Sequence, residues 1–381
     1  MTESQTPIAS AGEDRLSVAT QRQLMWWRFK KHRIAVISLW IVIFFYLIAL
    51  GAELLSTSDP TKGRSARAVV PPQPIFTFDH GAFRLHVCGI KGERDPYTLQ
   101  KTYKTDCAQK VDLAFFAHGF AYKFLGLIPS DRHLLGVAAG QDVTAEESIF
   151  LLGTDDQGRD LYSRILHGTR TSLTIGLVGV AMSLTLGITL GGISGFFGGT
   201  IDNVIQRVIE IIRSIPTIPL WMGLAAALPS NWGILQLYFA ITVIISLFAW
   251  TDLARVVRGR FLAMREEDFV TAALVAGAKW QDIIFRHMVP SFYSHLIASA
   301  TLAIPFMILS ETALSFLGLG LRPPAISWGV LLQAAQNVQA IALTPWLMIP
   351  AIPVIIIILA LNFMGDGLRD AADPYSAVEA S

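Results

Sequence analysis

Cysteine and charge are both scarce in this sequence. Only two cysteines, Cys88 and Cys107, occur among 381 residues, which is too few for a scaffold built on disulfides. Charged residues make up 15% of the chain and the formal net charge is +1, so no overall field favours nucleic acid or a strongly charged partner. The composition therefore excludes disulfide-rich small domains and argues against a nucleic-acid-binding function.

Motifs for nucleotide binding, hydrolysis and metal binding are absent as well. The sequence contains no G-x-x-x-x-G-K-[ST] phosphate loop, no G-x-S-x-G nucleophile turn, and no paired-histidine or C-x-x-C metal motif. We therefore predict that the chain is not itself an enzyme, and that it has no catalytic residues, no metal site and no cofactor of its own.

Long apolar runs are what the sequence has in abundance. Hydrophobic residues make up 52% of the chain and the mean hydropathy is +0.49, which is too apolar for an ordinary soluble protein of this size. A helix of about 20 apolar residues spans the hydrocarbon layer of a bilayer. Six runs are long enough, namely 34–52, 172–195, 209–228, 233–254, 296–313 and 346–363. They predict an all-α polytopic membrane protein with about six transmembrane helices.

Basic residues orient the predicted helices. Arg28, Lys30, Lys31 and Arg33 precede the first apolar run, and the loop 255–290 carries six further Lys or Arg residues. Because short loops rich in Lys and Arg stay in the cytoplasm, we place this loop and both termini inside. We predict a cytoplasmic tail over 1–33, a first transmembrane helix over 34–54, an outer insert over 55–168, a transmembrane domain over 169–368 and a cytoplasmic tail over 369–381.

Two segments leave alternatives open. The N-terminal tail, with Trp26 and Trp27, either forms a short helix in the lipid headgroup layer or remains a polar tether. The outer insert shows strand-like alternation around Phe76 to Val87, which predicts a small β-containing unit. Its cysteines, Cys88 and Cys107, are either linked in an oxidising compartment or remain two free thiols.

The inner loop 266–290 has the pattern of two short helices joined by a turn. Asp268 and the two glutamates before it suit a first helical turn, Ala272 and Ala273 favour its continuation, and Gly277 suits the left-handed turn that ends it. A second short helix is then expected up to about His287. The small side chains would let a partner protein approach the backbone; the alternative is a plain helical hairpin without a partner.

The spacing A-A-x-x-x-G, followed by Pro290, resembles the coupling loop of binding-protein-dependent ABC importer permeases. In that family the loop docks into a cleft on an ATPase subunit, so the resemblance implies an ATPase-coupling site. Its residues here would be Asp268, Thr271, Ala272, Ala273, Gly277, Arg286, His287 and Pro290. Thr271 departs from the pattern, since an acidic residue often stands there.

Three further segments, 152–173, 311–320 and 362–374, resemble the peptide/nickel type of these permeases and, within it, the dipeptide and oligopeptide permease C subunits. This resemblance implies the type I ABC importer fold in a bacterial inner membrane, with the insert in the periplasm. It implies a translocation path shared with a homologous second permease, two ATPase subunits that hold ATP and Mg²⁺, and an extracytoplasmic binding protein. Peptides are the expected cargo; nickel, opines and oligosaccharides are alternatives, and an ion-driven transporter or a membrane scaffold is a rival interpretation.

Several charged residues are weighed apart from the coupling loop. Asp155, Arg159 and Asp160 either contact the binding protein at the outer face or form a closed turn at a helix entrance. Glu311 and Asp252 lie near the ends of apolar runs, which favours interfacial or interhelical bonding over a proton relay.

Overall fold

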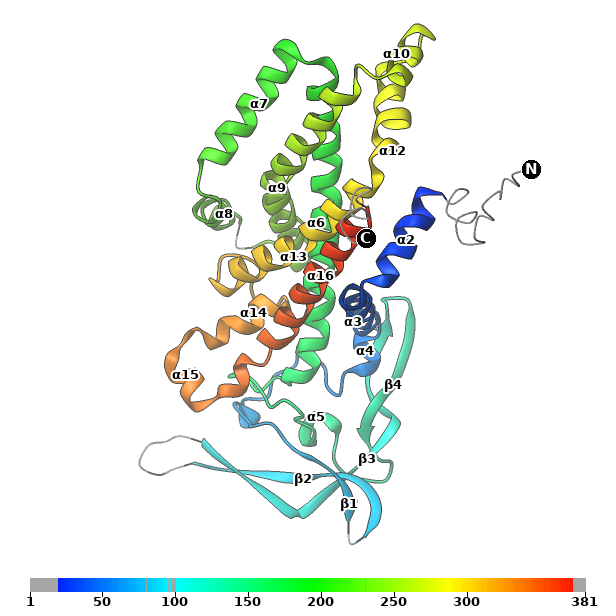
Figure 1. Cartoon of the computed structure of the whole chain (residues 1–381). Helices are drawn as coiled ribbons and strands as arrows, with labels where there is room; N and C mark the ends of the chain where they lie inside the picture. Colours follow the sequence, from blue (N-terminus) through cyan, green and yellow to red (C-terminus); the bar gives the residue numbers. More distant parts are fainter. Residues whose placement is uncertain (1–19, 80, 95, 97–100, 230, 373–381) are drawn as a thin grey trace, which may run out of the picture.

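The helices of this computed structural model form a fan, and a four-stranded insert lies beyond one end of it (Figure 1). The structure describes residues 20–79, 81–94, 96, 101–229 and 231–372. Residues 1–19 of the predicted N-terminal tail and 373–381 of the predicted C-terminal tail lie outside the described residues. The helices are α2 (Gln21–Lys31), α3 (Arg33–Leu50), α4 (Ala52–Leu55), α5 (Ala145–Ser148), α6 (Leu161–Phe197), α7 (Gly199–Ser214), α8 (Thr217–Ala226), α9 (Ile234–Met264), α10 (Asp268–Val275), α11 (Trp280–Asp282), α12 (Val289–Ser291), α13 (Tyr293–Phe316), α14 (Trp328–Gln333), α15 (Val338–Leu343) and α16 (Ala351–Ala372). Short 3₁₀ turns lie at Ser65–Arg67, Ala334–Gln336 and Pro345–Met348.

Five helices in the described part of the chain are long and apolar enough to cross a membrane. They are α3, α6, α9, α13 and the segment Pro345–Ala372 that contains α16. The pair α7 and α8 would provide a sixth crossing as a broken span, because the two helices are bent by 85°. The structure therefore reaches the predicted number of about six transmembrane crossings only if α7 and α8 together count as one broken span.

The third predicted crossing, 209–228, is wrong as a continuous helix. The chain leaves the helix at Ile215, which has extended dihedral angles of −91° and 130°, and α8 begins after Pro216. Proline has no N–H to donate and disfavours helical geometry in the residue before it. The break therefore follows directly from the sequence at this point.

Several helices extend beyond the boundaries that hydropathy predicts. The N-terminus of α6 lies at Leu161, so 161–168 is helix and not part of the insert, and α9 continues to Met264 inside the predicted loop 255–290. Asp160 caps α6 by accepting a hydrogen bond from the Ser163 N–H at 2.8 Å. Hydropathy marks where lipid contact ends, whereas caps and hydrogen bonds decide where a helix ends.

Close helix packing in the centre of the fan depends on glycine. A Cβ at Gly191 would lie 2.4 Å from the Ala254 carbonyl oxygen, and one at Gly195 would lie 2.5 Å from Cβ of Phe261. Both distances are far below ordinary contact, so α6 and α9 meet backbone to backbone at these positions, as small-residue stripes allow in membranes.

The N-terminal segment forms helix α2, whose Thr20 cap makes reciprocal hydrogen bonds with Gln23. Phe29 is 2% exposed and packs with Ala35 of α3 and Ala371 of α16. Of the two alternatives for this segment, the structure supports a helix, and it docks that helix on the bundle.

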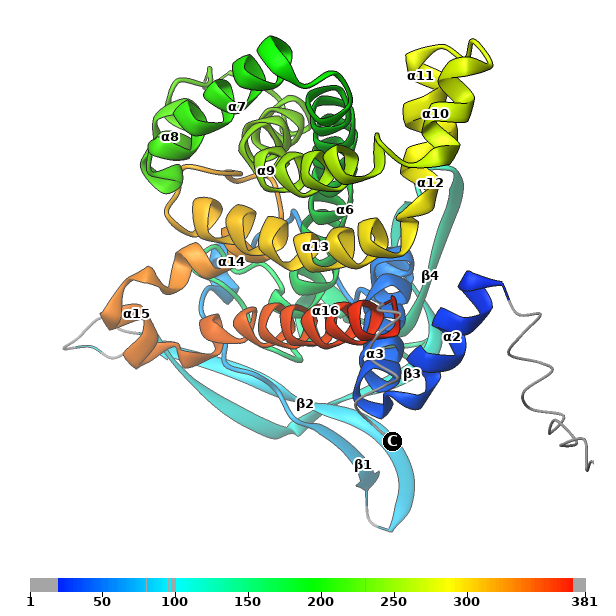
Figure 2. The same cartoon turned by 45° about the horizontal axis from the view of Figure 1, so that its top comes forward.

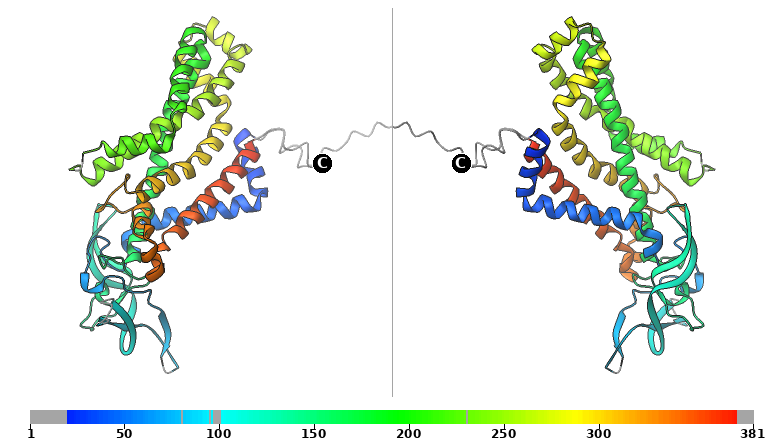
Figure 3. Two further views of the ribbon diagram at one scale, coloured as in Figure 1. Left: turned by 90° about the vertical axis from the view of Figure 1, so that its left-hand side faces the viewer. Right: turned by 90° about the vertical axis from the view of Figure 1, so that its right-hand side faces the viewer.

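The outer insert is an antiparallel sheet in the order β1-β2-β3-β4, with β1 (Ile75–Asp79), β2 (Ala82–Arg94), β3 (Lys101–Phe124) and β4 (Ile128–Val137). The long strand β3 pairs with β2 by its first half and with β4 by its second half. Cys88 of β2 and Cys107 of β3 form a disulfide with a Cα–Cα distance of 4.6 Å. The side views in Figure 3 show the sheet at the opposite end of the molecule from α10.

Candidate functional site

The strongest candidate site is the segment Glu267–Ser291 between α9 and α13, which we call the elbow. It lies at the end of the molecule farthest from the insert (Figures 1 and 2). Its first arm is α10, preceded by Glu267 with extended dihedral angles and with Asp268 in the first turn. The arm ends at Gly277, whose φ is +78°. The helix and left-handed turn expected from the sequence are therefore present.

The second arm of the elbow is longer than predicted. It runs through α11, a π-helical stretch over Ile283–Met288 and α12 to Ser291, so it does not end near His287. Within it the Val289 N–H bonds to the Ile284 carbonyl five residues back, and Pro290 occupies the first turn of α12, where its missing N–H is tolerated. Pro290 thus lies inside the second arm and does not terminate it.

Buried apolar side chains fix the elbow to the transmembrane helices. Val270, Ile283, Ile284 and Met288 are fully buried. They form one cluster with Val257 and Phe261 of α9 and with Phe292 and Leu296 around the start of α13. Because a packed core resists deformation, a displacement of the elbow would be transmitted to both helices.

The exposed surface of the elbow includes both small residues and large apolar ones. Thr271, Ala272 and Gly277 are exposed and Ala273 is half-buried. No described atom lies within 4 Å of a Cβ built at Gly277. Five large apolar side chains are exposed by 36% to 85% around them: Phe269, Leu274, Val275, Trp280 and Phe285.

These exposed apolar residues are the part of the site that sequence reasoning missed. The signal was present, since apolar residues recur in a segment too polar to cross a membrane. Arg286 and His287, which were predicted as site residues, are also exposed, and Arg286 lies 3.5 Å from Asp282. Large exposed apolar patches mark sites of interaction with proteins, membranes or ligands.

The outer residues Asp155, Arg159 and Asp160 form a closed turn before α6. Asp155 is 3% exposed and accepts hydrogen bonds from the Gln157 and Arg159 N–H groups, both at 2.9 Å. It also pairs with the Arg159 side chain at 2.7 Å and with buried Arg164. These contacts are all within the chain, so a contact of Asp155 or Asp160 with a binding protein would require the turn to open.

Asp160 is buried in the same turn. Its Oδ2 accepts hydrogen bonds from the Ser163 N–H and from the Thr57 hydroxyl, while Oδ1 has no hydrogen-bond partner in the described structure. Burial raises the pKa of Asp160 from 3.8 to about 6, because the ionised form loses its hydration and these bonds offset only part of the loss.

A charged clasp holds α4 to α6 at the outer end of the helices. The Arg170 guanidinium pairs with both oxygens of Glu53 and donates to the Ala49 carbonyl at 2.7 Å. Burial acts to raise the pKa of Glu53, but the hydrogen bonds and charge of Arg170 outweigh it and hold the pKa below its ordinary value.

Glu311 is fully buried and bonds between helices. Its carboxylate accepts hydrogen bonds from Ser315 at 2.8 Å, from Ser327 at 2.7 Å and from Ser172 at 3.3 Å. Asp252 is exposed and pairs with Arg213 of α7. The interhelical bonding predicted for both residues is therefore observed.

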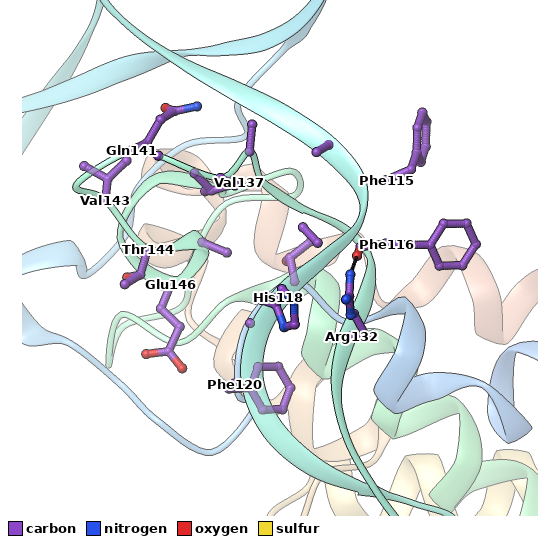
Figure 4. Close-up of a pocket in the computed structure, with 18 of the residues that line it drawn as sticks. Phe115, Phe116, His118, Phe120, Arg132, Val137, Gln141, Val143, Thr144 and Glu146 are labelled. Carbon is purple, nitrogen blue, oxygen red and sulfur yellow. Dashed lines mark hydrogen bonds between the residues drawn. The ribbon is translucent and has the colours of Figure 1, made fainter.

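The insert contains a hollow of about 740 Å³ between β3, β4 and the segment 137–146. Figure 4 shows His118, Arg132 and Glu146 around it, with Phe115 on the other side of the β3 ribbon from Gln141. Cationic and anionic side chains are mixed along its walls, so the hollow has no single charge preference.

Comparison with known proteins identifies the family. Residues 187–376 match the family described as "binding-protein-dependent transport system inner membrane component", and residues 20–72 match the "N-terminal TM domain of oligopeptide transport permease C". The dipeptide transport system permease protein DppC of Lactococcus lactis subsp. cremoris is 33% identical over 353 residues, which cover 92% of this chain and 90% of that protein. The chain therefore belongs to the family of binding-protein-dependent transport system inner membrane components.

A second curated relative agrees with this assignment for the permease. The oligopeptide transport system permease protein OppC of Haemophilus influenzae is 40% identical over 229 residues, covering 60% of the permease and 71% of the relative. A solved structure of the MetNI methionine ABC transporter in an inward-facing conformation matches with a TM-score of 0.41 and 17% identity, covering 55% of the permease and 96% of that chain. The permease is thus a multi-pass inner-membrane component of a binding-protein-dependent importer.

Proposed function

We propose that the permease forms a translocation path for peptides together with a homologous second permease, and that two ATPase subunits drive transport by docking on the elbow. The names of relatives support the choice of peptides as cargo, and the exposed surface of the elbow supports coupling to ATPase subunits. Relatives at 33% and 40% identity are named as dipeptide and oligopeptide permeases. The observation that carries the proposal is the exposed apolar surface at Phe269, Leu274 and Val275, on a segment packed into the membrane helices.

The mechanism follows from this packing. The ATPase subunits hold ATP and Mg²⁺. Closure of the two ATPase subunits on each other moves the elbow. Because Ile283, Ile284 and Met288 pack against both α9 and the start of α13, the elbow moves as one unit with these two helices. Reorientation of α9 and α13 then opens the path to one side of the membrane and closes it to the other.

The proposal also assigns sides and surfaces. The elbow and both termini lie in the cytoplasm, and the insert lies in the periplasm, where an extracytoplasmic binding protein delivers the solute. The bent pair α7 and α8 supports a contact with the second permease, since Val204, Ile211 and Ile218 are all more than half exposed there. Exposed apolar side chains on such a pair face either lipid or another membrane protein.

A charge placed on the elbow surface tests the proposal. Val275 is 85% exposed, so Val275→Glu should leave folding unchanged while placing an unpaired carboxylate in the docking surface. Burying that charge without a partner costs several kcal/mol. We expect loss of ATPase co-purification and at least a tenfold loss of peptide uptake, since about 1.4 kcal/mol already corresponds to a factor of ten.

The matched control is Phe78→Glu, which makes the same kind of change at a residue 67% exposed in the insert. This variant should retain the ATPase subunits. Normal ATPase co-purification and uptake in Val275→Glu would refute docking at the elbow.

A further inference from the structure

The tip of the β3–β4 hairpin carries an exposed apolar cluster. Phe124 of β3 pairs with Ile128 of β4, and a three-residue loop joins them. Leu125, Leu127 and Ile128 are 46%, 82% and 62% exposed. Exposing apolar side chains to water is unfavourable in free energy. Moving this cluster into an apolar environment would therefore be favourable, and the described chain does not supply one.

The backbone of this loop makes the choice of leucine notable. Leu125 has φ +50° and Gly126 has φ +75°, so both adopt left-handed geometry. Glycine, asparagine and aspartate favour such turn positions, and another residue costs about 1 kcal/mol or more there. Because the Leu125 side chain is largely exposed, packing within the insert does not offset this cost.

Hydrogen bonds fix the hairpin next to the membrane helices. The two ring nitrogens of His133 of β4 lie 3.1 Å from the Glu53 carbonyl oxygen of α4 and 3.0 Å from the Phe120 carbonyl oxygen, and the tautomer decides which carbonyl accepts the ring N–H. Glu53 is itself clasped by Arg170 of α6. Since only Gly51 separates the end of α3 from the start of α4, the hairpin is attached directly to one end of a predicted membrane span.

Beyond this attachment the hairpin turns back towards the helices. Figures 1 and 3 show it reaching the level of α3, whereas the β1–β2 turn lies at the far end of the insert. The outer half of α3 exposes Phe44, Leu47 and Leu50 by 51% to 60%, which is the lipid-facing surface of a span. The apolar tip thus lies at the level of a predicted membrane span that exposes apolar side chains of its own.

We propose that the tip of the β3–β4 hairpin inserts into the outer leaflet of the bilayer beside α3 and anchors the insert to the membrane surface. Leu125, Leu127 and Ile128 enter the boundary between headgroups and acyl chains, about 5–10 Å deep, as interfacial anchors do. The exposed Lys123 next to them extends its ammonium group to the lipid phosphates. This inference does not depend on the cargo or on ATPase docking.

A fluorescent label at the tip tests the anchor. Both native cysteines are in the disulfide, so Leu127→Cys introduces a single free thiol. The assembled transporter carrying nitrobenzoxadiazole at this position is placed in nanodiscs of phosphatidylethanolamine and phosphatidylglycerol. Quenching by phosphatidylcholine spin-labelled near the headgroup is compared with quenching by aqueous iodide. The control is Phe83→Cys, which replaces an exposed apolar residue at the β1–β2 turn.

The tip label should be quenched severalfold more by the spin-labelled lipid than the control label, and severalfold less by iodide. Equal iodide quenching at both positions would overturn the proposal, because the tip would then lie in water. Protection of the tip label from both quenchers would also overturn it, since a protein partner and not lipid would cover the hairpin.

Discussion

The elbow and the outer turn before α6 lie at opposite ends of the helices and use their side chains in opposite ways. The elbow exposes Thr271, Ala272 and Gly277 and surrounds them with exposed apolar groups. The outer turn buries Asp155 and Asp160 and saturates nearly all of their oxygens within the chain. The elbow leaves small and apolar side chains exposed, as the proposed docking requires, whereas the outer turn forms an internal brace.

Burial explains this difference. A carboxylate removed from water must be paired or hydrogen-bonded, so a dense group of charges in a turn is compatible with burial only if its members satisfy one another. Small residues in the elbow have no such requirement and can face an external partner. The charged turn at Asp155 and Asp160 is therefore part of the scaffold, whereas the docking surface that we propose includes small and apolar residues.

The largest effect should come from breaking the outer brace. Asp155→Ala would remove the carboxylate that pairs with the buried Arg164 guanidinium. It would also remove the acceptor for the hydrogen bonds from the Gln157 and Arg159 N–H groups. Removing one partner of a buried ion pair costs about 3–5 kcal/mol. We expect a marked drop in the thermal unfolding midpoint of the detergent-solubilised permease, measured by intrinsic fluorescence.

The neighbouring Asp156 provides the control, since it is exposed. Asp156→Ala should change stability by no more than about 0.5 kcal/mol. If Asp155→Ala were equally harmless, the turn would not brace the helix entrance and a role at the outer surface would regain support.

Much of the helical architecture could be predicted from the sequence. Apolar runs located α3, α9, α13 and the span Pro345–Ala372 that contains α16 to within a few residues at one end or both, because lipid demands apolar side chains and internally bonded backbone. The α10 helix and the turn at Gly277 followed from local residue chemistry. The helix break at Pro216 has a local cause in the sequence, but hydropathy alone predicts one continuous crossing over 209–228.

The missed features depend on tertiary contacts that hydropathy does not contain. Whether Asp155 faces a partner or Arg164 is decided by how the turn folds onto α6. The exposure of Val275 depends on which face of α10 packs on α9 and the second arm. The attachment of β4 to α4 through His133 joins residues 80 positions apart and has no local signal.

A smaller effect is expected from the pH dependence of the outer turn. The pKa of Asp160 is raised to about 6 in the folded chain from 3.8, so the folded state holds the proton more tightly than the unfolded state. The contribution of Asp160 protonation to the free energy of unfolding is therefore full below about pH 4 and is lost as the pH rises through about 6. Asp160→Asn keeps the helix cap but cannot ionise.

The measurement is the difference in unfolding midpoint between the permease and Asp160→Asn at pH 4.5 and at pH 7. The unmodified permease should lose stability relative to the variant between these two pH values, by about 2 kcal/mol for a pKa raised from 3.8 to about 6. Parallel behaviour of the two proteins would show that Asp160 is hydrated and that the turn is more open than its burial indicates.

The smallest effect concerns the elbow itself. Gly277→Ala places a methyl group in open space, so no described neighbour resists it, but φ at +78° costs a non-glycine residue about 1 kcal/mol. Gly259 in α9 is the matched control, because its Cβ also meets nothing within 4 Å and it lies inside a helix, where alanine stabilises by about 0.5–1 kcal/mol. Hydrogen exchange should therefore speed up around residue 277 and slow down around residue 259.

Uptake in Gly277→Ala should fall further than this strain explains if an ATPase surface lies against the backbone there, whereas a proportionate fall would mean that the glycine serves only the turn.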